Sequence, residues 1–253
     1  MGTLAGGNGA DRIQGSGQAV VDVLIPALNE EASVGHVLSA LPKGNAIGVR
    51  RVVVADNGST DRTAERARNH GALVVHEPRR GYGHACLAAM AAISDDPPDI
   101  VVFLDADFSD HPEELPLLTA PIEQDKADFV IGSRTRGTSE PGALLPQARF
   151  GNWLACTLMH LIWGVRYTDL GPFRAIRYDA LIRMDMTDKT YGWTIEMQIK
   201  AALLGLRHAE VPVSYRKRIG QSKVTGTIRG TIGAGVWILG TIGAYALRLR
   251  GTR

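Results

Sequence analysis

Apolar runs of strand length alternate with helical segments from about residue 20 to residue 134, and this alternation constrains the fold more than any other feature of the chain. The strand-length runs are residues 20–28, 49–55, 72–76, 100–104 and 129–131. Most of the segments between them have the length of a short helix, and Asn29, Glu30 and Glu31 supply the cap and the acids that favour a helix start after the first run. This pattern predicts βαβ units and an α/β fold with a mainly parallel, Rossmann-like central sheet flanked by helices.

The second half of the chain is less regular. Residues 150–165 and 195–204 favour helices, and residues 211–215 favour a strand. Residues 230–247 form an uncharged segment with arginines on both sides. Its length of 18 residues is the minimum for a membrane span. Because five glycines lower the hydropathy of this segment, we expect a helix that docks on the protein or lies in the membrane interface, with a true span as the alternative.

The sequence divides the chain into three parts. Residues 1–18 are rich in Gly, Ala, Asn and Gln and indicate a disordered tail. Residues 19–229 form the expected α/β domain, and residues 230–253 the C-terminal apolar helix with basic flanks. The two cysteines, Cys86 and Cys156, lie in apolar segments without metal-type spacing, which is typical of packing thiols in a reducing cytoplasmic setting.

The charge distribution narrows the class of partner. A formal net charge of +2 gives no case for nucleic-acid binding. Basic residues nevertheless outnumber a single acid, Glu210, between residues 207 and 229. These basic residues are Arg207, Arg216, Lys217, Arg218, Lys223 and Arg229. The local excess suits an anionic substrate or a membrane surface, and it is equally compatible with a solvated basic face.

Two carboxylates, Asp105 and Asp107, arrive one residue apart at the end of the apolar run 100–104. In open α/β sheets, ligands bind at this end of the strands. The two carboxylates repel each other unless a positive charge lies between them, and Mg²⁺ or Mn²⁺ takes carboxylates and substrate phosphates together. The motif therefore favours a metal that holds a diphosphate.

Two further strand ends carry acids, Glu30 after the first run and Asp56 after the second. Since the ends of parallel strands lie along one edge of a sheet, these acids and the Asp105–Asp107 pair are expected to share one crevice. Carboxylates at the first two strand ends suit ribose hydroxyls and base N–H groups, which makes the crevice a sugar-nucleotide site. Taken singly, Glu30 can be a helix N-terminal acid and Asp56 a turn former.

The motifs at these strand ends resemble those of the family 2 glycosyltransferases with a GT-A fold. They are residues 26–30 (PALNE), 56–61 (DNGSTD) and 105–110 (DADFSD). Four motifs of the second half resemble the dolichyl-phosphate mannose synthase branch and its bacterial polyprenyl-phosphate relatives. These are residues 132–134 (GSR), 168–174 (TDLGPFR), 192–197 (GWTIEM) and 218–223 (RIGQSK). The resemblance covers roughly residues 20–230.

The resemblance implies a role for each matching position. Pro26, Leu28, Glu30 and Asp56 would contact the base and the ribose. Asp105, Ala106 and Asp107 would hold the diphosphate and the metal, with Asp105 and Asp107 as metal ligands. Arg134 would reach the donor from the end of the fifth strand, and Arg218 and Lys223 would come from a loop that closes over the diphosphate. The chain has Ser109 where the synthases often have a metal-binding Gln, and its LGPFR sequence differs from their SGFR type.

The reaction implied is inverting, metal-dependent transfer of a hexose from a nucleotide sugar, of the GDP-mannose or UDP-glucose type, to polyprenyl or dolichyl phosphate. Such an acceptor is already anionic, so it needs a cation such as Arg174 to position it. An alternative is a soluble alcohol or protein acceptor, for which Asp169 or Glu196 would be the general base. Glu196 at a helix start and Asp169 in a turn are also compatible with structural roles. A lipid acceptor would imply peripheral contact with the cytoplasmic face of a membrane.

Overall fold

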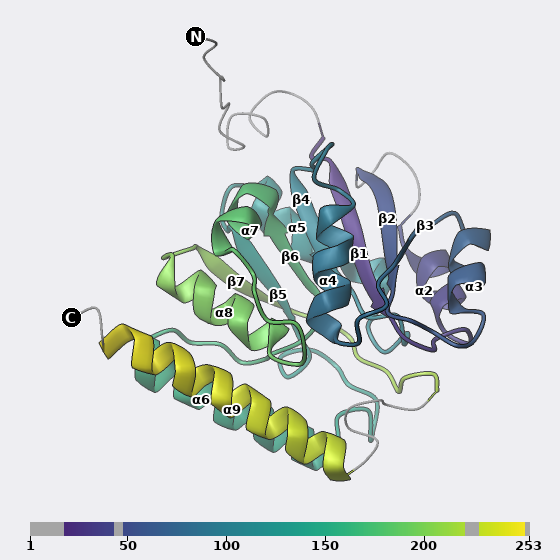
Figure 1. The fold of residues 1–253 in the computed structure, drawn as a ribbon. Helices are drawn as coiled ribbons and strands as arrows, with labels where there is room; N and C mark the ends of the chain where they lie inside the picture. The colour runs from purple at the N-terminus through teal and green to yellow at the C-terminus, as the bar shows by residue number, and fades with distance from the viewer. Residues whose placement is uncertain (1–17, 43–47, 221–227, 251–253) are drawn as a thin grey trace.

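The computed structural model describes residues 18–42, 48–220 and 228–250, and Figure 1 shows a central sheet with helices on both faces. Within these residues the sheet has seven strands in the order β3-β2-β1-β4-β6-β5-β7. The strands are β1 Val21–Ala27, β2 Val49–Asp56, β3 Leu73–His76, β4 Ile100–Phe103, β5 Phe129–Ser133, β6 Arg174–Arg177 and β7 His208–Pro212. Only β6 is antiparallel to its neighbours, β4 and β5. The predicted mainly parallel sheet is therefore confirmed.

The helices divide between the two faces of the sheet according to which apolar side chains they bury. They are α2 Val34–Ala40, α3 Thr63–Asn69, α4 Tyr82–Ala91, α5 Leu115–Glu123, α6 Pro146–Trp163, α7 Tyr178–Met184, α8 Trp193–Leu203 and α9 Ile228–Arg250, with a short 3₁₀ helix at Pro112–Glu114. Residues of α4, α6, α7 and α8 pack on one face, and residues of α2, α3 and α5 pack on the other. Alternate residues of each buried strand, such as Val101 and Val102 of β4, contribute to opposite layers because strand side chains alternate.

The predicted strand ends meet at one edge. In the parallel ladders Ala27 of β1 lies beside Asp56 of β2, and Leu24 of β1 lies beside Phe103 of β4. The residues that follow these strands therefore emerge together, as the motif spacing predicted. β6 and α7 were not predicted, because the sequence of β6, RAIR, has only two apolar residues. The last strand begins at His208, three residues before the predicted strand 211–215.

The apolar C-terminal segment forms α9, which lies alongside α6 at the outside of the α8 layer (Figure 1). Ile242 is buried in the core, whereas Val236 and Leu247 are 63% and 69% exposed. Among the described helices none is both long and apolar enough to cross a bilayer. The predicted tail and Lys223 fall outside the described residues, apart from Gln18 at the end of that tail.

Candidate active site

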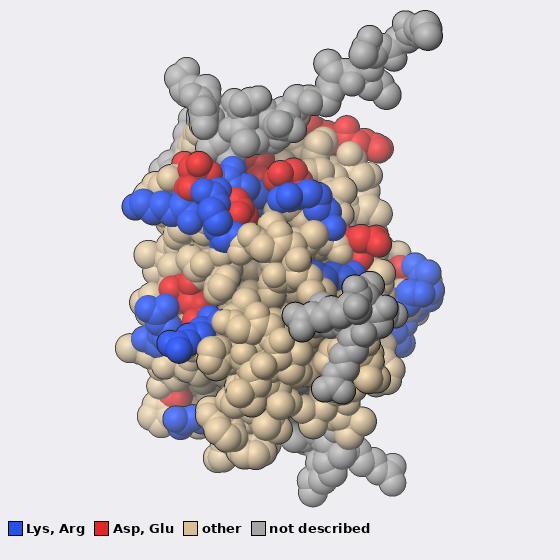
Figure 2. Space-filling model, turned by 90° about the vertical axis from the view of Figure 1, so that its left-hand side faces the viewer, with Lys and Arg blue, Asp and Glu red and all other residues tan. Residues whose placement is uncertain are grey.

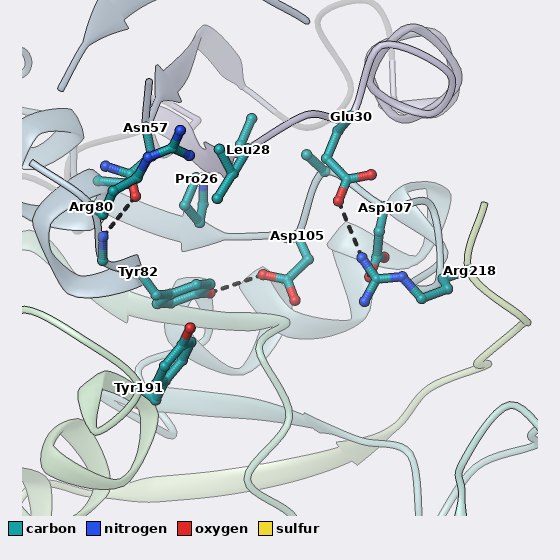
Figure 3. A pocket seen from close by; sticks show the side chains of 14 residues that line it. Pro26, Leu28, Glu30, Asn57, Arg80, Tyr82, Asp105, Asp107, Tyr191 and Arg218 are labelled. Carbon is teal, nitrogen blue, oxygen red and sulfur yellow. Dashed lines mark hydrogen bonds and ion pairs between the residues drawn. The ribbon is translucent and has the colours of Figure 1, made fainter. Parts of the chain in front are cut away.

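A cavity of about 330 Å³ opens at the carboxyl ends of β1, β2 and β4 (Figure 3). Its walls come from the strand ends, from the start of α4 and from the loop before α8. The lining residues are Pro26, Ala27, Leu28, Glu30, Asn57, Arg80, Gly81, Tyr82, Ala85, Asp105, Ala106, Asp107, Tyr191 and Arg218. Seven of these were predicted, either from the strand-end acids or from the family resemblance, namely Pro26, Leu28, Glu30, Asp105, Ala106, Asp107 and Arg218.

The two carboxylates after β4 have different surroundings. Tyr82 donates a hydrogen bond to Oδ1 of Asp105 at 2.9 Å. Burial, together with the nearby charge of Asp107, raises the pKa of Asp105 to about 7. Asp107 instead accepts hydrogen bonds at Oδ1 from the Ser109 amide at 2.9 Å and the Ser109 hydroxyl at 2.6 Å. Ser109 thus fixes the orientation of Asp107.

A guanidinium lies between two acids at the mouth of the cavity. The Nη2 atom of Arg218 is 3.1 Å from Oε1 of Glu30 and 3.2 Å from Oδ2 of Asp107. The backbone of the same segment is tied to the β4 loop, because the Ile219 amide donates to the Asp107 carbonyl at 3.0 Å. Arg218 therefore supplies positive charge beside the carboxylates from a segment more than a hundred residues away in the sequence.

The donor atoms of this site fit a hard divalent cation. Asp105 and Asp107 present carboxylate oxygens. The raised pKa of Asp105 means that its negative charge is unfavourable in this site, and a bound cation would offset that cost. In the described part of the chain no group of three or more His, Cys, Asp and Glu side chains gathers to hold a metal. A set of one or two carboxylates, completed by water and substrate phosphate, is typical of Mg²⁺ rather than of a metal caged by protein ligands.

At the other end of the cavity the lining includes Asn57, the residue that follows Asp56. Asp56 is 5% exposed, and its Oδ1 accepts a hydrogen bond from the Ser59 amide at 3.1 Å. The Asn57 side chain donates to the carbonyls of Glu77 and Arg79 and accepts from the Gly81 amide at 2.8 Å. Asn57 therefore clamps the chain that carries Arg80 and Tyr82 to the wall of the cavity.

Arg134 and Asp169 form a buried pair outside the lining of the cavity. The Nε and Nη2 atoms of Arg134 donate to the two oxygens of Asp169 at 2.8 and 2.7 Å, and the Arg134 amide donates as well. Burial by itself would lower the pKa of the Arg134 guanidinium, but the charge and hydrogen bonds of Asp169 raise this pKa. Since Asp169 is completely buried, its predicted role as a general base has no support in this geometry. The predicted contact of Arg134 with the donor is likewise absent from the lining.

Glu196 is also buried and fully engaged. It accepts hydrogen bonds from the hydroxyls of Thr187 and Tyr245 at 2.6 and 2.8 Å and from the Asp188 amide at 2.7 Å, and Lys200 lies 3.0 Å away. Burial alone would raise the pKa of Glu196, but these hydrogen bonds outweigh it and lower the pKa. The carboxylate holds a loop and two helices together, so a role as the general base is not supported here.

Arg174 does not reach the cavity. It is completely buried in β6, where Nε donates to the Gly171 carbonyl at 3.1 Å and Nη1 to the Thr194 carbonyl at 3.0 Å. Burial lowers the pKa of its guanidinium to about 10. Its donors are turned to backbone oxygens, so this geometry does not support the predicted contact of Arg174 with an acceptor phosphate.

Seven lining residues were not predicted from the sequence, and the four with polar side chains are Asn57, Arg80, Tyr82 and Tyr191. Tyr82 begins α4, and Tyr191 belongs to the loop between α7 and α8 (Figure 3). Neither tyrosine follows a predicted strand or lies in a motif of catalytic type. The adjacent sequence at residues 192–197 was the only signal near Tyr191.

These features together define an enzyme class. A mainly parallel α/β sheet with two metal-type carboxylates, a cation and a cavity at the strand ends is suited to bind a nucleoside diphosphate sugar. A family model described as glycosyl transferase family 2 matches residues 22–185. The chain belongs to this family.

Two relatives and one solved structure extend the comparison. An uncharacterized glycosyltransferase of Mycobacterium tuberculosis is 39% identical over 215 residues, which are 84% of this chain and 93% of that protein. A dolichyl-phosphate hexose transferase of Haloferax volcanii is 35% identical over 205 residues, 80% of this chain and 85% of that protein. The crystal structure of glucosyl-3-phosphoglycerate synthase from M. tuberculosis with Mn²⁺, UDP and phosphoglyceric acid has a TM-score of 0.72 at 24% identity, covering 96% of this chain and 84% of that one. This likeness confirms the predicted GT-A fold.

Proposed function

We propose that this glycosyltransferase transfers a hexose from a nucleotide sugar to the phosphate of a polyprenyl or dolichyl phosphate, with Mn²⁺ or Mg²⁺ at Asp105 and Asp107. The observation that carries the proposal is the contrast between two sets of acids. Asp105 and Asp107 line the cavity, whereas Asp169 and Glu196, the two candidate general bases, are buried and engaged by other residues. An acceptor that is already an anionic nucleophile needs no general base.

The donor would lie along the cavity with its diphosphate at the carboxylate end. A bound divalent cation would supply electrostatic stabilisation of the leaving nucleoside diphosphate. Arg218 lies beside this position, and it would move its donors from Glu30 and Asp107 to the phosphate oxygens. The base would lie toward Pro26, Leu28 and Arg80, where the cavity wall is mixed apolar and cationic.

The acceptor assignment has support from a relative and from the surface. The H. volcanii relative is named for a dolichyl-phosphate acceptor. On α6 and α9 several large apolar side chains are exposed, namely Phe150, Trp153, Leu161, Val236, Trp237 and Leu247. Figure 2 shows the left-hand side of the view in Figure 1, and residues other than Lys, Arg, Asp and Glu cover most of its lower part. This face would rest on a membrane surface and give a polyprenyl chain an apolar path, with aromatic side chains at the lipid boundary.

Nucleotide release tests this proposal directly. The purified protein is incubated with Mn²⁺ and UDP-glucose or GDP-mannose, together with a polyprenyl phosphate, the corresponding polyprenol, or no lipid. We expect release of UDP or GDP only with the phosphorylated lipid, and the donor that reacts identifies the base and the sugar. Because the polyprenol differs only in the phosphate, it separates a phosphate acceptor from an alcohol acceptor.

The alternative from the sequence is a soluble alcohol or protein acceptor. It requires Asp169 or Glu196 to leave its present partners and reach the cavity. Turnover with a soluble acceptor such as phosphoglyceric acid, and none with polyprenyl phosphate, would replace our proposal by this alternative. In that case Asp169→Asn and Glu196→Gln would separate the two candidate bases.

A further inference from the structure

Two polar contacts of described side chains attach the outer helix α9 to the protein, in addition to its apolar packing. The indole N–H of Trp237 donates to Oδ2 of Asp188 at 3.2 Å, and the hydroxyl of Tyr245 donates to Oε1 of Glu196 at 2.8 Å. Both acceptors belong to one neighbourhood, the loop between α7 and α8 (residues 185–192) and the first turn of α8. We call residues 185–192 the α7–α8 loop.

The same two carboxylates organise the α7–α8 loop. Glu196 accepts the amide of Asp188 at 2.7 Å, and Asp188 accepts the amides of Thr190 and Gly192 at 2.7 and 3.1 Å. Each carboxylate therefore joins α9 to the backbone of the loop. Since hydrogen bonds to charged groups are stronger than those between neutral groups, these contacts are expected to limit the motion of the loop.

The α7–α8 loop in turn packs backbone to backbone on the start of α4. The Gly83 amide donates to the Thr190 carbonyl at 3.2 Å, and the His84 amide donates to the Lys189 carbonyl at 3.1 Å. A Cβ atom at Gly81 or at Gly83 would lie 2.1 Å from a carbonyl oxygen of the loop, so only glycine permits this approach.

Two tyrosines connect this contact to the cavity. Tyr82, between the two glycines, donates its hydrogen bond to Asp105. Tyr191, at the end of the α7–α8 loop, lines the cavity and points toward Tyr82 and Asp105 in Figure 3. A continuous set of contacts thus leads from α9 through Asp188 and Glu196 to the wall of the cavity.

We propose that Trp237 and Tyr245 of α9 are positioning residues for the nucleotide cavity, acting through Asp188 and Glu196 on the α7–α8 loop and its Tyr191. The inference deepens the proposed function, since it takes the cavity as the donor site. Neither residue touches the cavity, and nothing in the local sequence of α9 distinguishes them from other aromatic residues of an apolar helix. Their side chains contact the α7–α8 loop and α8 from α9, whereas Tyr191 of the same loop lines the cavity.

Two conservative variants test the proposal. Trp237→Phe and Tyr245→Phe each remove one hydrogen-bond donor and keep an aromatic ring. We expect faster amide hydrogen exchange in the α7–α8 loop, and about three- to tenfold weaker binding of UDP or GDP with Mn²⁺ in calorimetric titrations. In turnover, the KM for the sugar nucleotide should rise more than kcat falls. Because both donors act on the same loop, the loss of nucleotide-binding free energy in the double variant should not exceed the sum of the losses in the two single variants.

Matched controls come from aromatic residues away from the loop. Trp163→Phe changes an indole of α6 whose buried N–H has no hydrogen-bond partner among the described residues, and Tyr178→Phe changes a partly buried tyrosine of α7. Both should bind nucleotide and exchange amides like the unaltered protein. A lower melting temperature in the α9 variants, with unchanged nucleotide affinity and unchanged loop exchange, would mean a purely structural role and overturn the proposal.

These readouts separate failure of the inference from failure of the proposed function. Loop exchange and binding of UDP or GDP are measured without any acceptor. If polyprenyl phosphate proves not to be the acceptor, the binding and exchange results still decide whether α9 positions the cavity wall. If nucleotide binds with equal affinity to all variants, the positioning role is excluded whatever the acceptor.

Discussion

The replacement Asp105→Asn should make the metal-free protein more stable at neutral pH. The folded protein holds a proton on Asp105 up to a pKa of about 7, whereas the ordinary value is 3.8. Between these two values the folded state binds more protons than the unfolded chain, so the free energy of unfolding falls as the pH rises from about 4 to 7. An asparagine is neutral throughout and still accepts the hydrogen bond of Tyr82.

The size of the effect follows from the pKa. Three pKa units at about 1.4 kcal/mol each set an upper limit of about 4 kcal/mol. Because Asp105 is partly exposed to the cavity, solvent screens the charge, and we expect about 2 to 4 kcal/mol at pH 8. For a chain of this size that corresponds to roughly 5–15 °C in the melting temperature.

Urea denaturation in EDTA, at intervals from pH 4 to pH 8, measures this difference. The curves of the two proteins should nearly coincide at pH 4 and separate as the pH rises. Addition of Mn²⁺ with UDP or GDP should stabilise the unaltered protein more than the variant, because the cation takes the place of the proton. Parallel curves over the whole pH range would refute the electrostatic account of the Asp105–Asp107 pair.

Three further substitutions test other parts of the structure. Asp107→Ala should abolish nucleotide release and leave the circular dichroism spectrum unchanged; wild-type turnover in this variant, or full activity in excess EDTA, would contradict the metal site. Asp169→Asn leaves a buried arginine without its charge partner and should lower the free energy of unfolding in urea by about 3 to 5 kcal/mol, and a loss below 1 kcal/mol would show that the pair is not critical. Gly83→Ala forces a Cβ against the Asp188 carbonyl and should cost about 2 kcal/mol or more by the same measurement, whereas Gly151→Ala, with open space around its Cβ, should be neutral or stabilising.

The site was predictable where its residues follow strands directly. Glu30, Asp105 and Asp107 come straight after apolar runs whose length and composition identify them as strands. Parallel strands bring their carboxyl ends to one edge, so the spacing along the chain was sufficient to place these acids together. Asp56 was predicted at the same edge, and the lining of the cavity includes the next residue, Asn57.

The sequence by itself determined the alternating order of strands and helices, because side-chain periodicity is a local property. It also determined the chemistry at the strand ends. Only the tertiary structure decided that Arg174, Asp169 and Glu196 are buried and engaged, since burial depends on which elements pack over a residue. It likewise decided that Tyr191 lines the cavity. This wall is set by contacts between α4, the α7–α8 loop and α9, which are far apart in the chain and leave no local pattern.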